Sequence, residues 1–260
     1  MKKTLIALAM AASAVVSGSV IAADWEASGS GGSFEMGGTL TMISNLTPWE
    51  VKVGAAVNNL DATIEKGGNT VSIPVNTTIP VLSIRTNQRE FVKVWGASPQ
   101  INYGGFTPNS DMSEAGLGML TLDVTNEDGE HIGKVKIPLT VGAVGTSSTG
   151  RAAGLMAPQE GDVFWGGLAT SEGMSLTYNN VLAKINAIDP EAILNYQDGT
   201  AGTTDSSIYS ISPSDDGQTY NAAYVSGIES GKSMIITFND AIKPGTITWK
   251  ASLPVTVSYA

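Results

Sequence analysis

Side chains of two kinds alternate over the last twelve residues, and this pattern constrains the fold more than any other feature of the sequence. The even positions are mostly small or polar. The odd positions are mostly large and apolar: Trp249, Ala251, Leu253, Val255, Val257 and Tyr259. A period of two predicts a β-strand with one face turned toward a core. Because Pro254 has no N–H to donate, we expect this strand to have one free or irregular side.

Shorter segments with the same period, or with runs of β-branched residues, recur along most of the chain. They predict strands at residues 49–53, 70–75, 79–84, 91–95, 119–125, 133–141, 222–228, 233–238 and 246–259. Turn signals such as Asp128-Gly129 separate them, and the 30 glycines and the charged fraction of 15% suit a chain of strands and turns. The sequence therefore predicts an all-β sandwich.

One region, at about residues 150–200, departs from this period. Apolar residues recur there at helical spacing: Val181, Leu182, Ile185 and Ile188. Asp189-Pro190 follows them as an N-cap with proline at the first helical position, which predicts a second short helix. We therefore expect a small helical insertion in the sandwich.

The first 22 residues have the pattern of a secretory signal peptide. Lys2 and Lys3 precede an apolar run, and compact residues lead to a cleavage site after Ala22, or alternatively after Ala23. A membrane anchor is the weaker interpretation, because the apolar run is too short to span a bilayer. Removing this segment takes two of the 14 cations and none of the 24 anions, which leaves a net charge of −12. So acidic a chain is not expected to bind nucleic acid.

Composition argues against most catalytic chemistry. The chain has no cysteine and one histidine, His131, which excludes thiolate nucleophiles, Cys-ligated zinc and multi-histidine metal sites. No Gly-x-Ser-x-Gly elbow precedes a helix, and no phosphate-binding loop is present. We predict no catalytic residues, metal or cofactor, and no enzyme activity.

The segment after the signal peptide complements the last strand. Residues 28–33 are all glycine or serine, typical of a flexible linker, and an alternating stretch follows with one face made of Phe34, Met36, Gly38 and Leu40. We interpret residues 23–42 as an extension that carries a donor strand, and residues 43–260 as the folded domain. Such a strand could complete the sheet of the next copy, a head-to-tail contact that builds a filament. Alternatively, it pairs within its own domain.

Several blocks of the sequence resemble one known family. They are WEVKVG at 49–54, NEDGEHIGKVK at 126–136, VFWGGL at 163–168, AAYVSGI at 222–228, TFNDA at 237–241 and TWKASLPVTVSY at 248–259. The chain is similar to the subunits of chaperone–usher fimbriae, specifically to the FaeG-like or ClpG-like major subunits. The match is most specific at the C-terminal block, where the penultimate Tyr259 belongs to the pattern that the periplasmic chaperone recognises.

The resemblance implies an incomplete immunoglobulin-like sandwich that is completed by a donated strand. A periplasmic chaperone would hold the last strand, and an outer-membrane usher would exchange the chaperone for the next subunit's extension. By this analogy Phe34, Met36, Gly38 and Leu40 form the donor face. The acceptor groove and chaperone contact would be lined by Leu253, Val255, Val257 and Tyr259.

The same resemblance implies a binding site for host glycans in the insertion. The candidate residues are Asp162, Phe164, Trp165, Tyr178, Asn179 and Asn180. For Phe164 and Trp165 the alternative is packing of the insertion onto the sheet, and Asn179 and Asn180 could instead cap a helix.

We thus predict the major structural subunit of an adhesive fimbria, exported through the periplasm to the cell surface. Its partners would be other copies of itself, the chaperone, the usher and host glycoconjugates. The alternative is a secreted carbohydrate-binding protein or carbohydrate-active enzyme with a complete sandwich.

Overall fold

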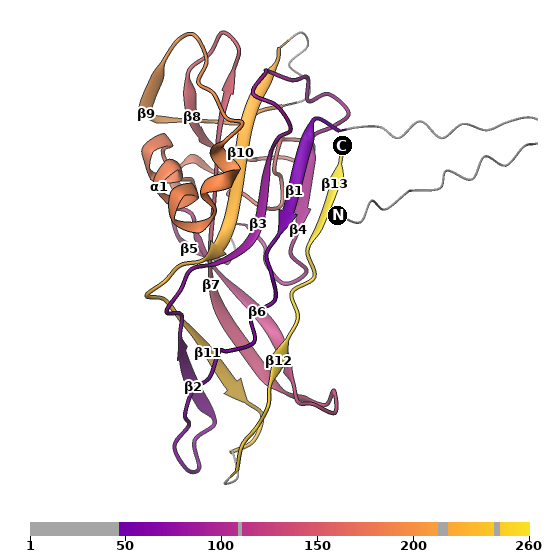
Figure 1. The fold of residues 1–260 in the computed structure, drawn as a ribbon, viewed down its shortest axis with the longest axis vertical. Coiled ribbons are helices and arrows are strands. Elements are labelled where there is room, and N and C mark those ends of the chain that lie inside the picture. The colour runs from indigo at the N-terminus through magenta and orange to yellow at the C-terminus, as the bar shows by residue number, and fades with distance from the viewer. Residues whose placement is uncertain (1–46, 109–110, 213–217, 242–244) are drawn as a thin grey trace, which may run out of the picture. The chain divides into compact units, whose positions relative to one another are not determined.

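The computed structural model describes residues 47–108, 111–212, 218–241 and 245–260, all within one compact unit, Asn45–Ala260 (Figure 1). The predicted signal peptide and donor strand lie outside the described residues. The described strands are β1 (Trp49–Val53), β2 (Thr70–Pro74), β3 (Ile79–Thr86), β4 (Pro99–Asn102), β5 (Met112–Glu114), β6 (Leu117–Thr125), β7 (His131–Ser147), β8 (Ala152–Leu155), β9 (Thr203–Tyr209), β10 (Tyr220–Ile228), β11 (Ser233–Phe238), β12 (Lys250–Ala251) and β13 (Thr256–Tyr259). The described helices are α1 (Tyr178–Ile188) and the 3-10 turns η1 (Glu172–Met174) and η2 (Pro190–Ile193).

The long strand β7 joins the two layers of the fold. Its first half pairs with β6 on one side and with β11 on the other, and β11 pairs in turn with β2. Its second half pairs with β10 and β8. From there β10 leads to β3 and β1, and β8 leads to β9. The fold is an all-β, immunoglobulin-like sandwich whose sheets do not close, with a small helical insertion, which confirms the predicted fold class.

The core lies between the layers and follows the period of two seen in the sequence. On β11, Met234, Ile236 and Phe238 are buried while the residues between them are exposed. On β6, Leu120 and Val124 are buried in the same way. Alternation of this kind is expected where one face of an antiparallel sheet covers a core and the other meets water.

Two of the strand predictions need correction. Residues 91–95 form no strand apart from a single bridge between Val92 and Tyr220, and a tight turn that includes Gly96, with φ of +66°, ends this segment. The predicted strand 246–259 is broken into β12 and β13, and Pro254 lies in the break, as expected for a residue without an N–H.

The insertion consists of β8, α1, η2 and β9. Strand β8 extends the sheet beyond β7 and pairs in parallel with β9. Helix α1 buries one face, including Val181 and Ile185, against Val144 of β7 and Val225 of β10. Because this packing covers the second face of the sheet, every residue of β10 is buried. The helix at residues 181–188 is thus confirmed, with its start at Tyr178.

Candidate functional site

Strand β13 presents one edge that is not paired within the described part of the chain. Ser98 and Ala260 exchange two backbone hydrogen bonds of 3.1 Å, which marks a hydrogen-bonded pair at the end of the β4–β13 ladder. Such pairs alternate with non-hydrogen-bonded ones in an antiparallel ladder, so Ser258 also directs its backbone groups toward β4. The N–H and C=O groups of Val257 and Tyr259 therefore point to the opposite edge, where no described strand pairs with them.

Strand β1 has an open edge of the same kind. Asn87 donates to the carbonyl of Pro48, and Gly54 donates to the carbonyl of Val81, each at 2.9 Å. Between these two bonds, residues whose backbone groups face β3 alternate with residues whose backbone groups face away. Val51 and Val53 are of the second kind, so their N–H and C=O groups point away from β3. Among the described residues, no strand other than β3 pairs with β1.

The connection from β1 to β2 also lacks backbone pairing. Residues 55–63 form neither helix nor strand, and they make no backbone hydrogen bond to any described residue. Leu60 and Ile64 are partly buried against the core, while most of their neighbours are exposed. Backbone groups in a folded protein are normally paired or hydrated, so this segment and the edges of β1 and β13 offer free donors and acceptors to an added strand.

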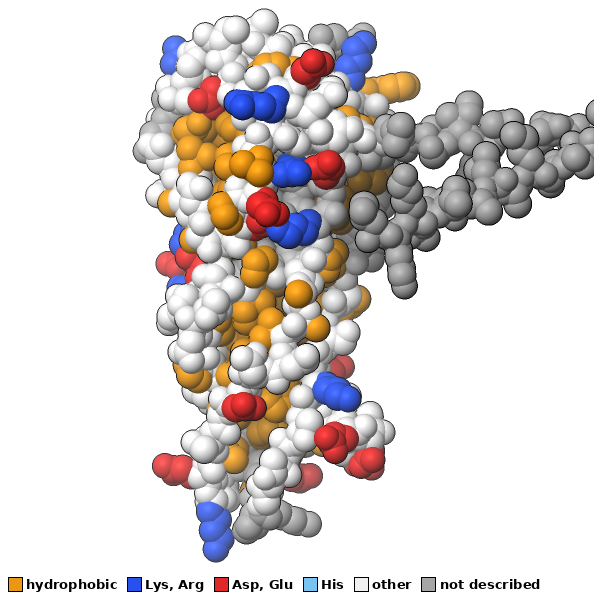
Figure 2. Space-filling view, in the orientation of Figure 1, with side chains coloured by type: hydrophobic (Ala, Val, Ile, Leu, Met, Phe, Trp, Pro, Cys, Tyr) orange, Lys and Arg blue, Asp and Glu red, His pale blue; other side chains and the backbone are white. Residues whose placement is uncertain are grey.

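Apolar side chains lie beside these open edges. Leu253, Val255 and Val257 are partly buried and pack against the core, whereas Pro254, Thr256 and Ser258 are exposed, as the period of two predicted. On β1 the apolar face is uncovered, since Val51 is 41% and Val53 is 60% exposed. Figure 2 shows hydrophobic side chains gathered in a band between the positions of β2 and β12 in Figure 1. Tyr259 differs from the other predicted groove residues in being exposed.

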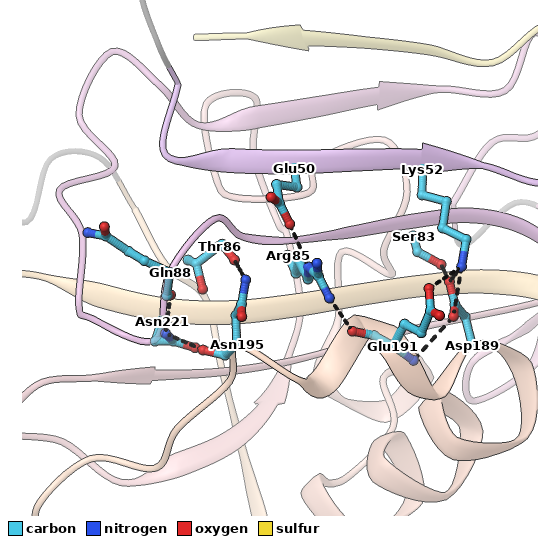
Figure 3. A network of polar contacts seen from close by, with 10 residues as sticks. All are labelled: Glu50, Lys52, Ser83, Arg85, Thr86, Gln88, Asp189, Glu191, Asn195 and Asn221. Carbon is cyan, nitrogen blue, oxygen red and sulfur yellow. Dashed lines mark hydrogen bonds and ion pairs between the residues drawn. The ribbon is translucent and has the colours of Figure 1, made fainter. Parts of the chain in front are cut away.

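A second concentration of polar contacts lies where the insertion meets the outer face of β1 and β3 (Figure 3). The Nζ of Lys52 lies 3.1 Å from Oδ2 of Asp189 and 2.9 Å from Oε2 of Glu191. Ser83 donates its hydroxyl to Asp189 at 2.7 Å, and Arg85 donates to the carbonyl of Glu191 at 2.6 Å. The residues bound a cleft of about 430 Å³ lined by Glu50, Val51, Lys52, Ser83, Arg85, Asp189, Glu191 and Ala192.

The charges of this cluster stabilise one another. Burial by itself would raise the pKa of Asp189, but the hydrogen bonds from Ser83 and Lys52 outweigh burial and hold that pKa below its usual value. The hydrogen bonds to Glu191 and Asp189 raise the pKa of Lys52. Asp189 also accepts a hydrogen bond from the backbone N–H of Glu191, which confirms it as the N-cap of η2. The predicted cap therefore does more than begin a helix, because it also holds η2 against β1 and β3.

The first three glycan candidates lie beside β4. Asp162 and Phe164 are buried, and the ring of Phe164 contacts Trp49 and Tyr224 at centroid distances of 5.5 and 5.3 Å. Trp165 is partly buried against the same core, and its carbonyl accepts a hydrogen bond from Ile101. In this conformation the side chains of Asp162 and Phe164 are out of reach of a ligand in solution.

The other three candidates lie on α1, in a separate hydrophobic cluster. Tyr178 is buried and donates its hydroxyl to Asp198 at 2.8 Å. Asn179 and Asn180 are exposed, and neither caps the helix, whose N-cap is Thr177. The structure thus divides the six candidates into two groups rather than gathering them at one surface. Sequence reasoning did not single out Lys52, Arg85 or Glu191 as site residues, because docking of the insertion onto β1 and β3 is what brings them together.

The described residues contain no group of three or more His, Asp or Glu side chains arranged to hold a metal ion. None of the described helices is long and apolar enough to span a membrane.

Comparison with known proteins places the sequence in one family. The family described as "Fimbrial, major and minor subunit" matches residues 1–260. K88 fimbrial protein AC of Escherichia coli is 30% identical over 292 residues, and K88 fimbrial protein AB of the same organism is 31% identical over 294 residues. The F41 fimbrial protein of Escherichia coli is 28% identical over 287 residues. Each alignment covers 100% of both chains. These relatives are fimbrial proteins rather than enzymes, and the chain belongs to the K88-type (FaeG-like) family of major and minor fimbrial subunits, which assemble with other subunits into a fibre on the cell surface.

Proposed function

We propose that this fimbrial subunit polymerises by donor-strand exchange and that it builds the shaft of the fibre as its major subunit. Phe34, Met36, Gly38 and Leu40 of one copy would enter the groove of the next, beside Leu253, Val255 and Val257. The observation that supports this most directly is that β1 and β13 each have an edge with which no described strand pairs, and that apolar side chains flank both edges. Gly38 would allow the two backbones to approach closely, because it has no side chain.

The physical advantage of an added strand is twofold. It would pair the free backbone groups of Val257 and Tyr259, and each net hydrogen bond contributes about 0.5–1.5 kcal/mol. It would also remove partly exposed apolar side chains from water, at about 25 cal/mol per Å². A subunit without that strand should be only marginally stable. The stability that the added strand contributes would account for the strength of a fibre whose subunits have no cysteine to cross-link them.

Export would follow the route that the sequence predicts. The signal peptide of residues 1–22 would direct the chain to the periplasm, where a chaperone would cover the groove and contact Tyr259. An outer-membrane usher would then replace the chaperone with the extension of residues 23–42 from the next subunit. The exposed position of Tyr259 next to the open edge of β13 supports a contact of this kind.

Deletion of residues 28–41 tests the polymerisation mechanism. We expect the truncated chain to remain a chaperone-bound monomer, because its fold is intact but it has no strand to donate. As a matched control, residues 34–42 joined after Ala260 through a linker should give a stable, self-complemented monomer. Fibres of normal length from the deletion would contradict donor-strand exchange.

The chaperone contact and the alternative function have their own tests. Tyr259→Asp should lower the periplasmic yield, and an unchanged yield would exclude the contact.

The alternative function, a secreted carbohydrate-binding protein or enzyme with a complete sandwich, requires a stable monomer without any added strand. Gel filtration of the mature chain expressed alone, with and without the fused donor strand, separates these possibilities.

We propose in addition that the insertion binds host glycans. This is supported by its position as an added element on the outer face of the sheet, where function often lies on segments grafted onto a scaffold. The accessible candidates are Trp165 beside β4 and Asn179 and Asn180 on α1. A glycan array with the self-complemented monomer, and with Trp165→Ala and Asn180→Ala separately, tests both groups. Binding unchanged by either variant would remove these candidates.

A further inference from the structure

One tryptophan stands out on the surface of the sandwich. Trp95 is 82% exposed, although Val92 and Val94 of the same segment are buried. It lies in a tight turn in which Ala97 donates to the carbonyl of Val94 at 3.0 Å. A large aromatic side chain that is so exposed is unusual unless a partner covers it, and tryptophan is enriched among residues that dominate binding energy at interfaces.

The turn lies at the end of the sandwich where β1 begins and β13 ends (Figure 1). The indole nitrogen of Trp49 donates to the carbonyl of Ala97 at 2.7 Å, and Ser98 pairs with Ala260. The chain therefore enters β1 beside the Trp95 turn. If residues 34–42 fill a neighbour's groove, the four residues 43–46 span at most about 18 Å to Thr47. The neighbouring domain must then lie against this end.

The direction of the donated strand decides which end of the neighbour it meets. A strand parallel to β13 would place the donor's domain at the acceptor's own Trp95 end, where the acceptor's extension also begins. A strand antiparallel to β13 places the donor at the opposite end and leaves the acceptor's extension available for the next subunit. Only the antiparallel arrangement lets subunits add head to tail, because the donor's domain and the acceptor's own extension then lie at opposite ends of the acceptor.

The opposite end carries the hairpin between β6 and β7. Lys250 of β12 lies opposite Thr125, so β12 begins beside the turn at residues 126–130. That turn exposes Glu127, Asp128 and Glu130. On the other end, Lys93 is exposed two residues before Trp95, and it shares the loop with exposed Arg89 and Glu90. The two ends are therefore complementary in charge.

From the exposed tryptophan, its place beside the chain entry and this charge complementarity, we infer that Trp95 and Lys93 of one subunit dock on the 126–130 hairpin of the next copy. This contact rests on the proposed donor-strand mechanism and adds a second interface to it. It fixes the angle between adjacent domains and slows the loss of subunits from the fibre. The side chains on both sides come from the same sequence, so each subunit presents one half of the contact at each end.

The test uses fibres assembled from full-length chains together with their export machinery. Trp95→Ala fibres should still form, because the donor strand is intact. They should release subunits in denaturant at least about tenfold faster than wild type, as expected for loss of an interface hot spot, and should bend more in electron micrographs. Leu194→Ala, which truncates an exposed side chain on the insertion, is the matched control and should behave as wild type.

A charge exchange tests the identity of the partner surface. Lys93→Glu and Asp128→Lys should each speed subunit release by about two- to fivefold, in line with the modest strength of exposed ion pairs. The two changes in one chain should restore the wild-type rate, because every junction then regains an opposite-charge pair. Restoration by the double variant would support the contact even if Trp95→Ala folded poorly, which the melting temperature of the variant would reveal.

Other outcomes overturn the contact. Trp95→Ala fibres with wild-type release and stiffness would exclude it, and so would a double charge variant that is no better than either single change. Loss of glycan binding with unchanged fibres would make Trp95 a sugar platform, and loss of chaperone-bound subunit would make it a chaperone contact. Failure of the donor-strand mechanism would be visible separately, as fibres formed by the chain that lacks residues 28–41.

Discussion

Lys52 of β1 and Asp189 at the start of η2 form an ion pair with an Nζ–Oδ2 distance of 3.1 Å, and this pair connects the open-edged strand to the insertion. The Asp189 side chain is only 5% exposed, whereas Lys52 reaches it from the outer face of the sheet. The backbone groups of the neighbouring Val51 and Val53 point to the other edge of β1, with which no described strand pairs. Strand β1 thus contacts the insertion through the side chain of Lys52, and the backbone groups of Val51 and Val53 at its edge are placed to pair with a partner strand.

Replacing Asp189 should destabilise the docking of the insertion. Asp189→Asn removes the buried charge that Ser83 and Lys52 stabilise, and we expect the free energy of unfolding to fall by about 1–3 kcal/mol. Denaturant unfolding of the self-complemented monomer measures this change. Glu191→Gln is the matched control, since Glu191 contacts the same Lys52 but is 67% exposed, and it should cost less than about 1 kcal/mol. Equal losses would mean that burial of Asp189 contributes little.

The stability of the subunit should depend on pH in the acid range. The pKa of Asp189 is held low as described above, and that of Glu229 is low because hydrogen bonds from Lys184 and Thr140 outweigh the effect of burial. A carboxyl with a depressed pKa stabilises the fold above its unfolded-state pKa, about 3.9 for Asp and 4.3 for Glu. That contribution is lost as pH falls through the lower folded-state pKa.

We therefore expect an unfolding free energy that is steady above about pH 5 and falls steeply below about pH 4. Unfolding curves at a series of pH values measure the slope. A variant with Asp189→Asn and Glu229→Gln should be less stable at neutral pH and less sensitive to acid. An unchanged acid slope in that variant would assign the pH dependence to other groups.

Phe164 and Trp165 should respond differently to truncation. Phe164 is fully buried between Trp49 and Tyr224, so Phe164→Ala should cost about 3–5 kcal/mol of unfolding free energy. Trp165 is only partly buried, and Trp165→Ala should cost less. Thermal and denaturant unfolding of both variants provides the comparison. A stable Phe164→Ala variant that had lost only glycan binding would contradict the role of this ring in the core.

The hydroxyl of Tyr103 should contribute measurably to the core. It lies 2.8 Å from the hydroxyl of Tyr224 and 2.6 Å from that of Ser226, in a fully buried position. Tyr103→Phe leaves both partners with one hydrogen bond fewer, so we expect a loss of about 1–3 kcal/mol. Tyr259→Phe, which removes an exposed hydroxyl, is the control and should stay within about 0.5 kcal/mol of wild type. A neutral Tyr103→Phe would mean that the remaining hydroxyls re-pair without cost.

Local patterns in the sequence predicted the elements well where a single face meets the core. The strands at residues 49–53, 119–125 and 233–238 and the helix at 181–188 were all recognisable from periods of two or about 3.6. The second half of β7 was missed, because α1 covers its outer face and both sets of alternating residues are buried. A strand buried on both faces loses the alternation that identifies it.

Only part of the candidate site could be predicted in the same way. The apolar face of Leu253, Val255 and Val257 could be predicted from alternation, and the family from blocks spread along the chain. The division of the glycan candidates between two clusters could not be predicted from the sequence. Phe164 and Tyr178 are close in sequence, but they pack against different faces of the sheet.

By itself, the sequence determined which segments become strands or helix, which of their faces are apolar, and that the chain is a fimbrial subunit. Only the tertiary structure decided which strand edges have no described partner, that Lys52 meets Asp189, and that the exposed Trp95 turn lies where the chain enters β1. The reason is physical. Periodicity depends on residues a few positions apart, whereas pairing and burial depend on which distant segments come into contact, and that is fixed only when the whole sandwich packs.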